Sequence, residues 1–241
     1  MKAIVLAAGE GQRLKGVLDD IPKPMARIAG KPILEYNIEW LKNADVTDIY
    51  VNLHHLPDVI TQHFGDGSRW GTKITYSFEP QLLGTAGAVK KIADTYWKNS
   101  STESFLVVYG DNLFSNFELH RIIHFHKEKR GIGTICLYRK PEEIFKSGIA
   151  VINENCRIIN FIEKPSANQV ASDLVNTGVY VFEPAILKYI PQNSYFDFSR
   201  DVFAKVIAGD EPLYGFLLNA NIITIDTPQL FKKFVILSDS R

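Results

Sequence analysis

The chain has 241 residues, and its 27 lysines and arginines balance its 27 aspartates and glutamates, giving a formal net charge of zero. Apolar residues make up 46% and charged residues 22%, which is typical of a globular protein and excludes a disordered or fibrous chain. The charge balance argues against nucleic-acid binding, because proteins of that class usually carry a basic excess. The two cysteines, Cys136 and Cys156, match no metal-ligand spacing and exclude a disulfide scaffold, so we expect a reducing compartment.

Membrane insertion and secretion are also disfavoured. No stretch approaches the roughly 18 apolar residues that a membrane helix needs. The apolar run Ala3–Ala8 ends at a glycine and is too short for the core of a signal peptide. We therefore expect a cytoplasmic protein without membrane contact.

Strands and helices alternate along the first half of the chain. The continuous apolar run Lys2–Ala7 predicts a strand buried on both faces, and apolar residues at helical spacing predict a helix over Lys31–Ala44. Thr85 is a candidate N-cap for a later helix. The remaining predicted elements are strands at Asp48–Leu53, Lys73–Ser77 and Phe105–Tyr109 and helices at Pro57–Phe64 and Thr85–Trp97. This alternation is typical of βαβ units and a mostly parallel sheet.

The second half is richer in strands. Strands are predicted at Thr134–Tyr138, Gly148–Ile152, Arg157–Ile162 and Thr177–Phe182, with a hairpin turn at Asn153–Asn155 and helices at Phe198–Ala208 and Pro228–Leu237. No linker or low-complexity segment interrupts the chain. We interpret residues 1–241 as a single α/β domain with two halves, 1–110 and 111–241.

A glycine-containing loop follows the first predicted strand and reads Leu6-Ala-Ala-Gly9-Glu-Gly11-Gln-Arg13. Small residues let backbone amides approach an anion, and an arginine supplies a rigid fork for phosphate oxygens. The loop does not match the dinucleotide-binding fingerprint, because Leu14 stands where the third glycine is needed, nor the P-loop pattern, because Val17 stands where a lysine is needed. A tight turn with a surface arginine and no bound phosphate therefore stays open as an alternative.

A second cationic segment, Pro22-Lys23-Pro24-Met25, comes nine residues after Arg13. The two prolines restrict the backbone on both sides of Lys23 and hold its side chain in a defined direction. An ammonium aimed back at the glycine loop would bind phosphate as a point charge. A rigid turn without a ligand is the alternative.

Together these segments resemble the opening of the sugar-1-phosphate nucleotidylyltransferases. The resemblance continues through Gly30–Tyr36, Leu83–Ala88, Gly110-Asp111, Ile162–Pro165 and Asn176–Phe182, and so covers nearly the whole chain in order. The mixture is most similar to the mannose-1-phosphate and heptose-1-phosphate guanylyltransferases. It implies a three-layer, Rossmann-like nucleotidyltransferase domain with a mostly parallel mixed central sheet. It also implies a nucleotide-binding half at 1–110 and a sugar-phosphate-binding half at 111–241, and the chain is too short for the C-terminal β-helix that some members carry.

The implied reaction is attack by a sugar-1-phosphate oxygen on the α-phosphorus of a nucleoside triphosphate, with release of pyrophosphate. Two anions must be brought into line, which requires cations at the phosphoryl oxygens. The resemblance makes Arg13, Lys23 and Asp111 the catalytic residues. It makes Asp111 and Asp226 ligands of Mg²⁺, although Asp111 could instead cap a turn. Two alignments of the C-terminal family motif are possible. One places the metal-binding aspartate at Asp226. The other places that position at Thr224, and Asp226 would then N-cap the last helix.

The same resemblance assigns the substrate contacts. The nucleotide-binding residues are Leu6, Ala8, Gly9, Glu10, Gly11, Arg13, Lys23, Glu79, Gly84, Thr85 and Asp111. The sugar-phosphate-binding residues are Tyr109, Gly148, Glu163, Lys164 and Asn176. Tight packing at Gly148 and a surface ion pair at Glu163-Lys164 are the alternatives.

Glu79 bears on the choice of base, because related thymidylyl and adenylyl enzymes often have glutamine there. A carboxylate accepts hydrogen bonds and donates none, and guanine presents two adjacent donors. GTP is therefore the favoured triphosphate. A phosphocholine- or phosphonate-type cytidylyltransferase and a nucleotide-sugar-binding regulatory subunit stay open as alternatives. A homodimer is compatible with the sequence.

Three histidines at His120, His124 and His126 do not form a zinc-binding pattern. We interpret them as part of a solvated helix face beside Lys127–Arg130.

Overall fold

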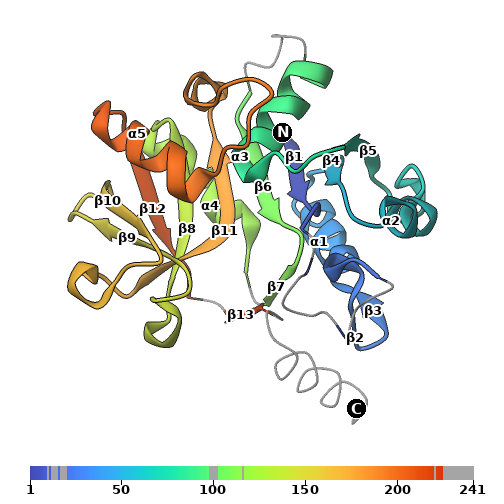
Figure 1. Ribbon diagram of the computed structural model, residues 1–241, viewed down its shortest axis with the longest axis horizontal. Helices are drawn as coiled ribbons and strands as arrows, with labels where there is room; N and C mark the ends of the chain where they lie inside the picture. The colour runs from blue at the N-terminus through green and yellow to red at the C-terminus, as the bar shows by residue number, and fades with distance from the viewer. Residues whose placement is uncertain are drawn as a thin grey trace. The chain divides into compact units, whose positions relative to one another are not determined.

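The computed structural model describes residues 1–9, 11, 16, 21–97, 103–115, 117–219 and 221–224. The chain divides into two compact units (Figure 1), and the boundary falls within strand β6 (Phe105–Tyr109). Unit 1 comprises Met1, Leu83–Val107 and Phe117–Ala220, and unit 2 comprises Lys2–Leu82, Val108–Asn116 and Asn221–Arg241. The two functional halves at 1–110 and 111–241 stay a prediction, and the compact units divide the chain differently because residues 83–107 belong with the later segments.

Unit 2 contains a parallel sheet of β1 (Lys2–Leu6), β4 (Asp48–Leu53) and β5 (Lys73–Phe78), which lie side by side in that order (Figure 1). The register pairs Leu6 with Asn52 and Asn52 with Ser77. Helices α1 (Ile33–Lys42) and α2 (Pro57–Phe64) form the connections between successive strands. The βαβ units predicted from the alternation of apolar patterns are therefore confirmed.

Helix α1 is shorter at both ends than its predicted range of Lys31–Ala44. Lys31 and Pro32 form the short strand β3, which pairs with β2 (Arg27–Ile28), so the helix begins at Ile33. After Lys42 the chain turns, and Asp45 adopts a positive φ of 59°. The buried stripe is Ile33, Leu34, Ile38 and Leu41. Burying side chains of this size contributes roughly 1.5–3 kcal/mol each.

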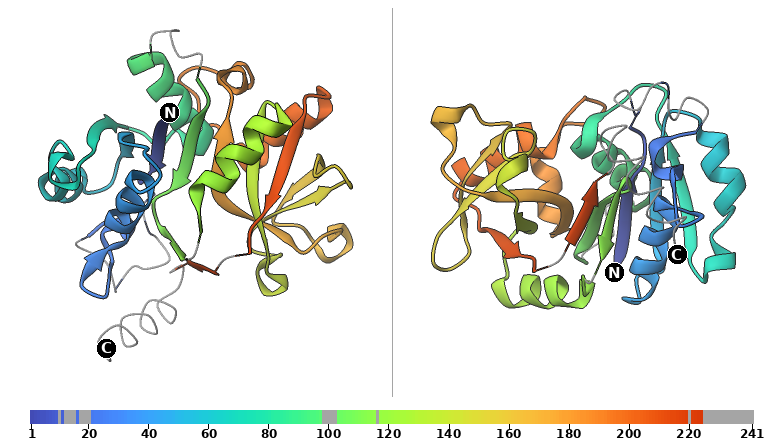
Figure 2. Two further views of the ribbon diagram at one scale, coloured as in Figure 1. Left: turned by 180° about the vertical axis from the view of Figure 1, so that it is seen from behind. Right: turned by 90° about the horizontal axis from the view of Figure 1, so that it is seen from below.

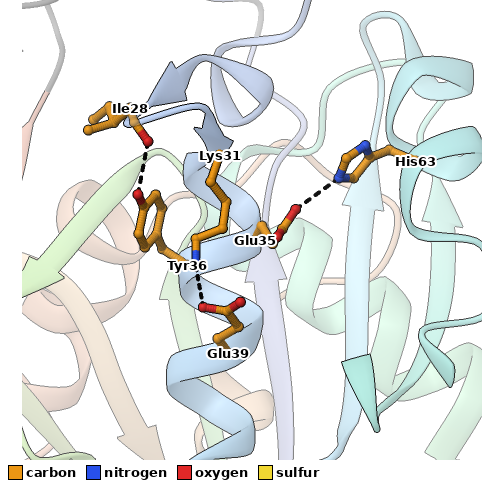
Figure 3. A network of polar contacts seen from close by, with 6 residues as sticks. All are labelled: Ile28, Lys31, Glu35, Tyr36, Glu39 and His63. Carbon is orange, nitrogen blue, oxygen red and sulfur yellow. Dashed lines mark hydrogen bonds and ion pairs between the residues drawn. The ribbon is translucent and has the colours of Figure 1, made fainter. Parts of the chain in front are cut away.

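Polar contacts on α1 tie it to its neighbours in unit 2 (Figure 3). Glu35 pairs with Nε2 of His63 on α2 at 3.0 Å, and the hydroxyl of Tyr36 donates to the Ile28 carbonyl of the β2–β3 hairpin at 2.9 Å. Lys31 of β3 pairs with Glu39 of α1. These contacts hold α1 at a fixed position on the polypeptide that precedes it and on α2.

Unit 2 also contains two short strands that are far apart in the sequence: one follows β6 directly, and the other is the last described segment of the chain. Strand β7 (Asn112–Ser115) pairs antiparallel with β13 (Asn221–Thr224). The ring of Trp40 on α1 stacks on Phe114 of β7 with centroids 4.9 Å apart. The segment just after β6 is therefore packed against α1. Asp226 and the predicted helix Pro228–Leu237 lie outside the described residues.

Unit 1 is built around mainly antiparallel strands. They are β8 (Gly133–Arg139), β9 (Gly148–Ile152), β10 (Ile158–Glu163), β11 (Leu174–Phe182) and β12 (Leu213–Leu217). β9 pairs with β10, β11 pairs with β8 and β9, all antiparallel, and β12 runs parallel to β8. The hairpin turn predicted at Asn153–Asn155 is confirmed, because Asn153 Oδ1 accepts from the amides of Asn155 and Arg157. The predicted α/β class with a mixed sheet is likewise confirmed.

Helices cover both faces of the unit 1 strands. Helix α4 (Leu119–Lys129) packs on β8 and β12 and lies in front of them in the rear view (Figure 2), whereas α5 (Phe203–Ala208) lies in front of them in Figure 1. The core on the α5 side is aromatic. Its fully buried rings are Tyr180, Phe182, Phe198 and Phe203, with the Phe182 and Phe198 centroids 5.0 Å apart. Such ring pairs add roughly 0.5–1.5 kcal/mol beyond their buried area.

Helix α3 (Gly84–Ile92) continues as a π-helical turn over Ala93–Trp97. The prediction that Thr85 is its N-cap is wrong, because the helix begins at Gly84 and Leu83 precedes it. The Thr85 hydroxyl instead donates to Asp197 Oδ2 at 2.8 Å and accepts from the Phe198 amide at 3.0 Å. The Thr85 hydroxyl therefore forms tertiary hydrogen bonds instead of capping the helix.

His126 also departs from its predicted environment. The structure does place it on a helix, α4, but its side chain is buried rather than solvated. Nδ1 lies 2.9 Å from Thr134 Oγ1 and Nε2 lies 3.1 Å from Glu183 Oε1. Burial lowers the pKa of this imidazole, and Glu183 opposes that effect. The solvated face is confirmed only for the exposed His120 and His124.

Short 3-10 turns complete the described elements at Lys23–Met25, Ser68–Trp70, Pro141–Glu143, Ala167–Gln169 and Pro184–Tyr189. A π-helical turn at Phe198–Val202 leads into α5, so the helix predicted at Phe198–Ala208 is confirmed. Among the helices of the described ranges, none has the length and apolar character needed to cross a membrane.

Candidate functional site

The glycine loop begins where β1 ends, at the carboxyl edge of the parallel sheet in unit 2. Leu6 is the last residue of β1, and the buried Ala7 donates its amide to Asn52 Oδ1 at 2.7 Å. Ala8 is buried, Gly9 is exposed, and Gly11 adopts a positive φ of 61° that favours glycine. Open α/β sheets place ligands at this edge. Glu10 and Arg13, two predicted nucleotide-binding residues, lie outside the described residues.

Lys23 and Asp111 form an ion pair in unit 2, although they are 88 positions apart in the sequence. Lys23 Nζ lies 2.6 Å from Asp111 Oδ2, and the two side chains are 10% and 32% exposed. Pro22 has extended backbone angles and Lys23 then opens a 3-10 turn with Pro24 and Met25, as the rigid segment predicts. The structure thus brings together the predicted phosphate-binding cation and the predicted metal ligand.

Gly110 fixes the position of Asp111. Its backbone amide donates to the Leu6 carbonyl at 2.9 Å, and its carbonyl accepts from the side-chain Nδ2 of the buried Asn37 at 3.2 Å. A Cβ atom at position 110 would lie 2.9 Å from the Val5 side chain, a distance that real Cβ atoms essentially never show. Asp111 is therefore held beside the end of β1 by close packing that only glycine permits.

The carboxylate of Asp111 fits a magnesium ligand by its chemistry. Mg²⁺ in nucleotide enzymes is usually held by one or two carboxylates together with substrate phosphates and water. Asp111 is partly exposed, and a carboxylate can accept from Lys23 while still offering lone pairs to an ion. Asp226 lies outside the described residues, and those residues contain no group of three or more potential metal ligands. Among the described residues, Asp111 is thus a predicted metal ligand whose position and chemistry are compatible with that role, which stays a prediction.

Glu79 lies just beyond the end of β5 in unit 2 and is almost completely buried, with 1% of its surface exposed. Its Oε1 accepts from Asn52 Nδ2 at 2.8 Å. Its amide donates to the Leu53 carbonyl at 2.7 Å, and its own carbonyl lies 2.7 Å from His54 Nδ1. Both the backbone and the carboxylate of Glu79 are therefore held in place.

In unit 1, two of the predicted sugar-binding residues interact with Ser199. Asn176 Nδ2 donates to the Tyr180 hydroxyl at 2.7 Å and to Ser199 Oγ at 3.3 Å, and the Ser199 side chain lowers the pKa of Glu163 at the end of β10. A Cβ atom at Gly148 would lie 2.8 Å from Glu163 Oε2. The absence of a side chain at Gly148 therefore leaves room for the Glu163 carboxylate.

The Glu163 carboxylate is in an unfavourable environment for its charge. Burial raises its pKa, and the nearby negative charge of Asp197 raises it further, whereas Lys164 and Arg200 lower it. Perturbed carboxyl groups of this kind concentrate at functional sites, although structural charge clusters also produce them. The next residue, Lys164, has a strained backbone, since this non-glycine residue has a φ of +49°. Its side chain is exposed.

Gly84 and Thr85 both have structural contacts within unit 1. A Cβ atom at Gly84 would lie 2.5 Å from the Phe196 carbonyl oxygen, and the φ of Gly84 is +71°. That same carbonyl accepts from the amides of Ala86 and Gly87. Their predicted role in nucleotide binding stays a prediction. Tyr109, predicted to contact the sugar, ends β6 and is half-buried.

Two residues of the candidate site were missed by sequence reasoning. Asn52 interrupts the apolar strand Asp48–Leu53, and a polar amide in such a run is the signal that could have found it. Asp197 has no comparable signal. Its Oδ1 accepts from the amides of Ser199 and Arg200 at 2.9 and 3.2 Å, while its Oδ2 accepts from Thr85. Asp197 therefore connects α3 to the segment that carries Ser199.

Comparison with known proteins identifies the family to which this chain belongs. The family model described as nucleotidyl transferase matches residues 2–222. A UTP–glucose-1-phosphate uridylyltransferase of Synechocystis sp. is 37% identical over an alignment of 225 residues, and the match covers 89% of this chain but 57% of that protein. This chain thus spans little more than half the length of that relative.

Two further proteins are similar over almost their full length. A D-glycero-α-D-manno-heptose 1-phosphate guanylyltransferase of Aneurinibacillus thermoaerophilus is 31% identical, covering 97% of this chain and 96% of that protein. The crystal structure of HddC from Yersinia pseudotuberculosis is 25% identical with a TM-score of 0.80 and 98% coverage of both chains. Another structure of that protein is complexed with GMP-PN. The resemblance drawn from the sequence motifs is confirmed, and the chain belongs to the nucleotidyl transferase family.

Proposed function

We propose that the protein transfers a nucleoside monophosphate from a triphosphate, with GTP favoured, to a hexose- or heptose-1-phosphate, giving a nucleotide sugar and pyrophosphate. The observation that carries this proposal is the Lys23–Asp111 ion pair at 2.6 Å beside the end of β1. A cation next to a carboxylate, at the edge of a parallel sheet where a glycine loop begins, suits a metal-bound triphosphate. The names of the relatives support the same reaction class.

The chemistry requires charge neutralisation and alignment, with no covalent intermediate on the protein. A sugar-phosphate oxygen forms a bond to the α-phosphorus, and the bond to the leaving pyrophosphate breaks. Lys23 stabilises negative charge on the phosphoryl oxygens, and we assign Arg13 the same role from the sequence. Asp111 and, by the sequence, Asp226 would hold Mg²⁺, which would supply additional positive charge to the triphosphate. Alignment of two bound reactants can lower such a barrier by roughly 7–11 kcal/mol.

Each unit would hold its own substrate groups. In unit 2 the backbone from Leu6 to Gly11 and the side chains of Lys23 and Glu79 would contact the nucleotide. In unit 1 Glu163 would accept hydrogen bonds from sugar hydroxyls and Lys164 would meet the sugar phosphate, with Asn176 and Gly148 beside them. Tyr109, which we also assign to the sugar, belongs to unit 2. A cytoplasmic location would suit these substrates.

GTP is preferred in this proposal because of the Glu79 carboxylate, which matches the adjacent N1–H and N2–H₂ donors of guanine. The relatives are divided on this point, since one is named for UTP and another for guanylyl transfer. The test is a matrix of mannose-, glucose- and heptose-1-phosphates against GTP, UTP, dTTP, CTP and ATP, with and without Mg²⁺. We expect Mg²⁺-dependent pyrophosphate release and the highest kcat/KM with GTP. Preference for UTP or dTTP would refute the role of Glu79, and binding without turnover would favour a regulatory subunit.

Replacing Glu163 by glutamine separates its proposed binding role from its effect on stability. Because the folded protein raises the pKa of Glu163, it holds that proton more tightly than the unfolded chain does. The free energy of unfolding therefore falls as pH rises from about 4.5 through the folded pKa, and Glu163→Gln removes this loss. We expect an unfolding midpoint at neutral pH at least equal to that of the parent. The KM for the sugar-1-phosphate rises about 10- to 100-fold, since a charged acceptor is lost.

Steady-state kinetics and thermal unfolding between pH 4 and 8 check the Glu163→Gln prediction. The control is Glu142→Gln, an exposed glutamate in the same unit, which should change neither quantity. An unchanged KM for the sugar-1-phosphate in Glu163→Gln would remove Glu163 from the binding site.

A further inference from the structure

Three polar side chains form a buried group near the carboxyl edge of the parallel sheet in unit 2. Asn52 on β4 is paired in register with Ser77 on β5, and Glu79 follows two positions later, on the same side of the chain as Ser77. All three are buried, with 4%, 2% and 1% of their surfaces exposed. Polar groups are seldom buried this deeply in a sheet unless their hydrogen bonds are satisfied.

Asn52 uses both ends of its side-chain amide within this group. Its Oδ1 accepts from the Ala7 amide at 2.7 Å, and its Nδ2 donates to Glu79 Oε1 at 2.8 Å. Ala7 is the first residue after β1 and so opens the glycine loop. One side chain therefore connects the start of the proposed phosphate-binding loop to the carboxylate proposed to select the base.

We infer that Asn52 is a positioning residue that sets the base preference by holding Glu79 and the first amide of the glycine loop in one hydrogen-bonded chain. This inference rests on the proposed function of the nucleotide site. An aliphatic residue at position 52 would suit the apolar strand, but it would leave a buried amide and a buried carboxylate unsatisfied. Asparagine is the neutral side chain of this length that both accepts from Ala7 and donates to Glu79.

The neighbouring Ser77 shows that a buried polar side chain in this group does not by itself require such a connection. Its hydroxyl has no hydrogen-bond partner in the described structure, although it is as deeply buried as Asn52. Removing an unpaired buried hydroxyl is close to neutral or stabilising. Ser77→Ala is therefore a matched control that changes a buried polar residue in the same register without touching the Ala7–Asn52–Glu79 chain.

The first variant is Asn52→Asp, which has nearly the same shape. Aspartate keeps an acceptor for the Ala7 amide but replaces the donor to Glu79 by a second carboxylate at hydrogen-bonding distance. Two carboxylates this close cannot both ionise without cost, so one of them binds a proton at higher pH than usual. We expect the KM and Kd for GTP to rise at least tenfold at pH 8, with a smaller change in kcat and partial recovery at pH 6.

The second variant adds Glu79→Gln to Asn52→Asp and reverses the hydrogen bond, since glutamine donates and aspartate accepts. In the single variant Glu79→Gln, the glutamine oxygen still accepts the hydrogen bond from Asn52, but the carboxylate proposed to bind guanine is lost. We therefore expect Asn52→Asp to have less than a twofold effect on triphosphate affinity when glutamine is at position 79. A purely structural Asn52 would give the same loss in both backgrounds, so the double-mutant cycle separates the two roles.

The readouts are kcat and KM for GTP and UTP, the Kd for both triphosphates by calorimetry, and the unfolding midpoint. Ser77→Ala is expected to stay within twofold of the parent in all affinities. The inference is overturned if Asn52→Asp binds GTP within twofold of the parent or shows equal losses in both Glu79 backgrounds. A parent protein that binds triphosphates but releases no pyrophosphate would refute the proposed reaction while the Kd cycle still decides the role of Asn52. A parent that binds no triphosphate would refute both.

Discussion

Asp111→Asn is expected to lower Mg²⁺-dependent pyrophosphate release by a factor on the order of 10²–10³ or more, without unfolding the protein. Asparagine has nearly the same shape but lacks the charge that would hold the metal ion and pair with Lys23 Nζ at 2.6 Å. The backbone at this position is fixed by Gly110, whose amide and carbonyl bond to Leu6 and Asn37, and these contacts do not involve the Asp111 side chain. The fold should therefore survive while the reaction does not.

Initial rates at several Mg²⁺ concentrations and the unfolding midpoint measure this effect. A matched control exists in unit 1, where Asp94 is 33% exposed and paired with Lys90 at 3.1 Å, much as Asp111 is 32% exposed and paired with Lys23. Asp94→Asn should keep the parent's rate. Parent-like rates in Asp111→Asn would exclude Asp111 from metal binding and from the mechanism.

Lys23→Met is expected to reduce kcat/KM for the triphosphate by a factor of about 10²–10³, because it removes a cation that acts on charge developing during the reaction. Lys23 is 10% exposed and is directed at Asp111 by the rigid Pro22-Lys23-Pro24 segment. Water screens little of its charge at this exposure, so its effect on bound phosphate is large. The uncharged methionine fills a similar volume, which limits the change in packing.

Stability should respond much less than activity in Lys23→Met. The partner carboxylate of Asp111 is about one-third exposed and can be solvated when the ammonium is lost. Lys90→Met, which breaks the corresponding ion pair on α3, is the control and should leave kcat/KM unchanged. A Lys23→Met enzyme with the parent's kcat/KM and the parent's affinity for pyrophosphate would show that the ion pair with Asp111 is only structural.

The paired variants also test the two residues as a unit. If Lys23 and a metal ion held by Asp111 stabilise the same phosphoryl oxygens, the double variant should lose little more activity than either single variant. Independent roles would give multiplicative losses. The kinetic cycle therefore distinguishes a shared electrostatic site from two separate contributions.

The sequence alone determined the three parallel strands and the two connecting helices of unit 2, together with the identity of the family, but not the short strands β2, β3, β7 and β13. Apolar periodicity predicted β4 and α2 with their observed bounds, because strand and helix periods are local properties of a chain. It overestimated α1, since pairing of Lys31 and Pro32 with β2 depends on a neighbouring strand rather than on local pattern. Motif order identified the family, which the family model confirms.

Only the tertiary structure decided which side chains meet. Sequence spacing could not show that Lys23 reaches Asp111, that Asn52 joins Ala7 to Glu79, or that the Thr85 hydroxyl binds Asp197 instead of capping α3. The burial of His126 between Thr134 and Glu183 was hidden for the same reason. Local patterns state which face of an element is apolar, whereas the partner of a buried polar group depends on which strands and helices become neighbours.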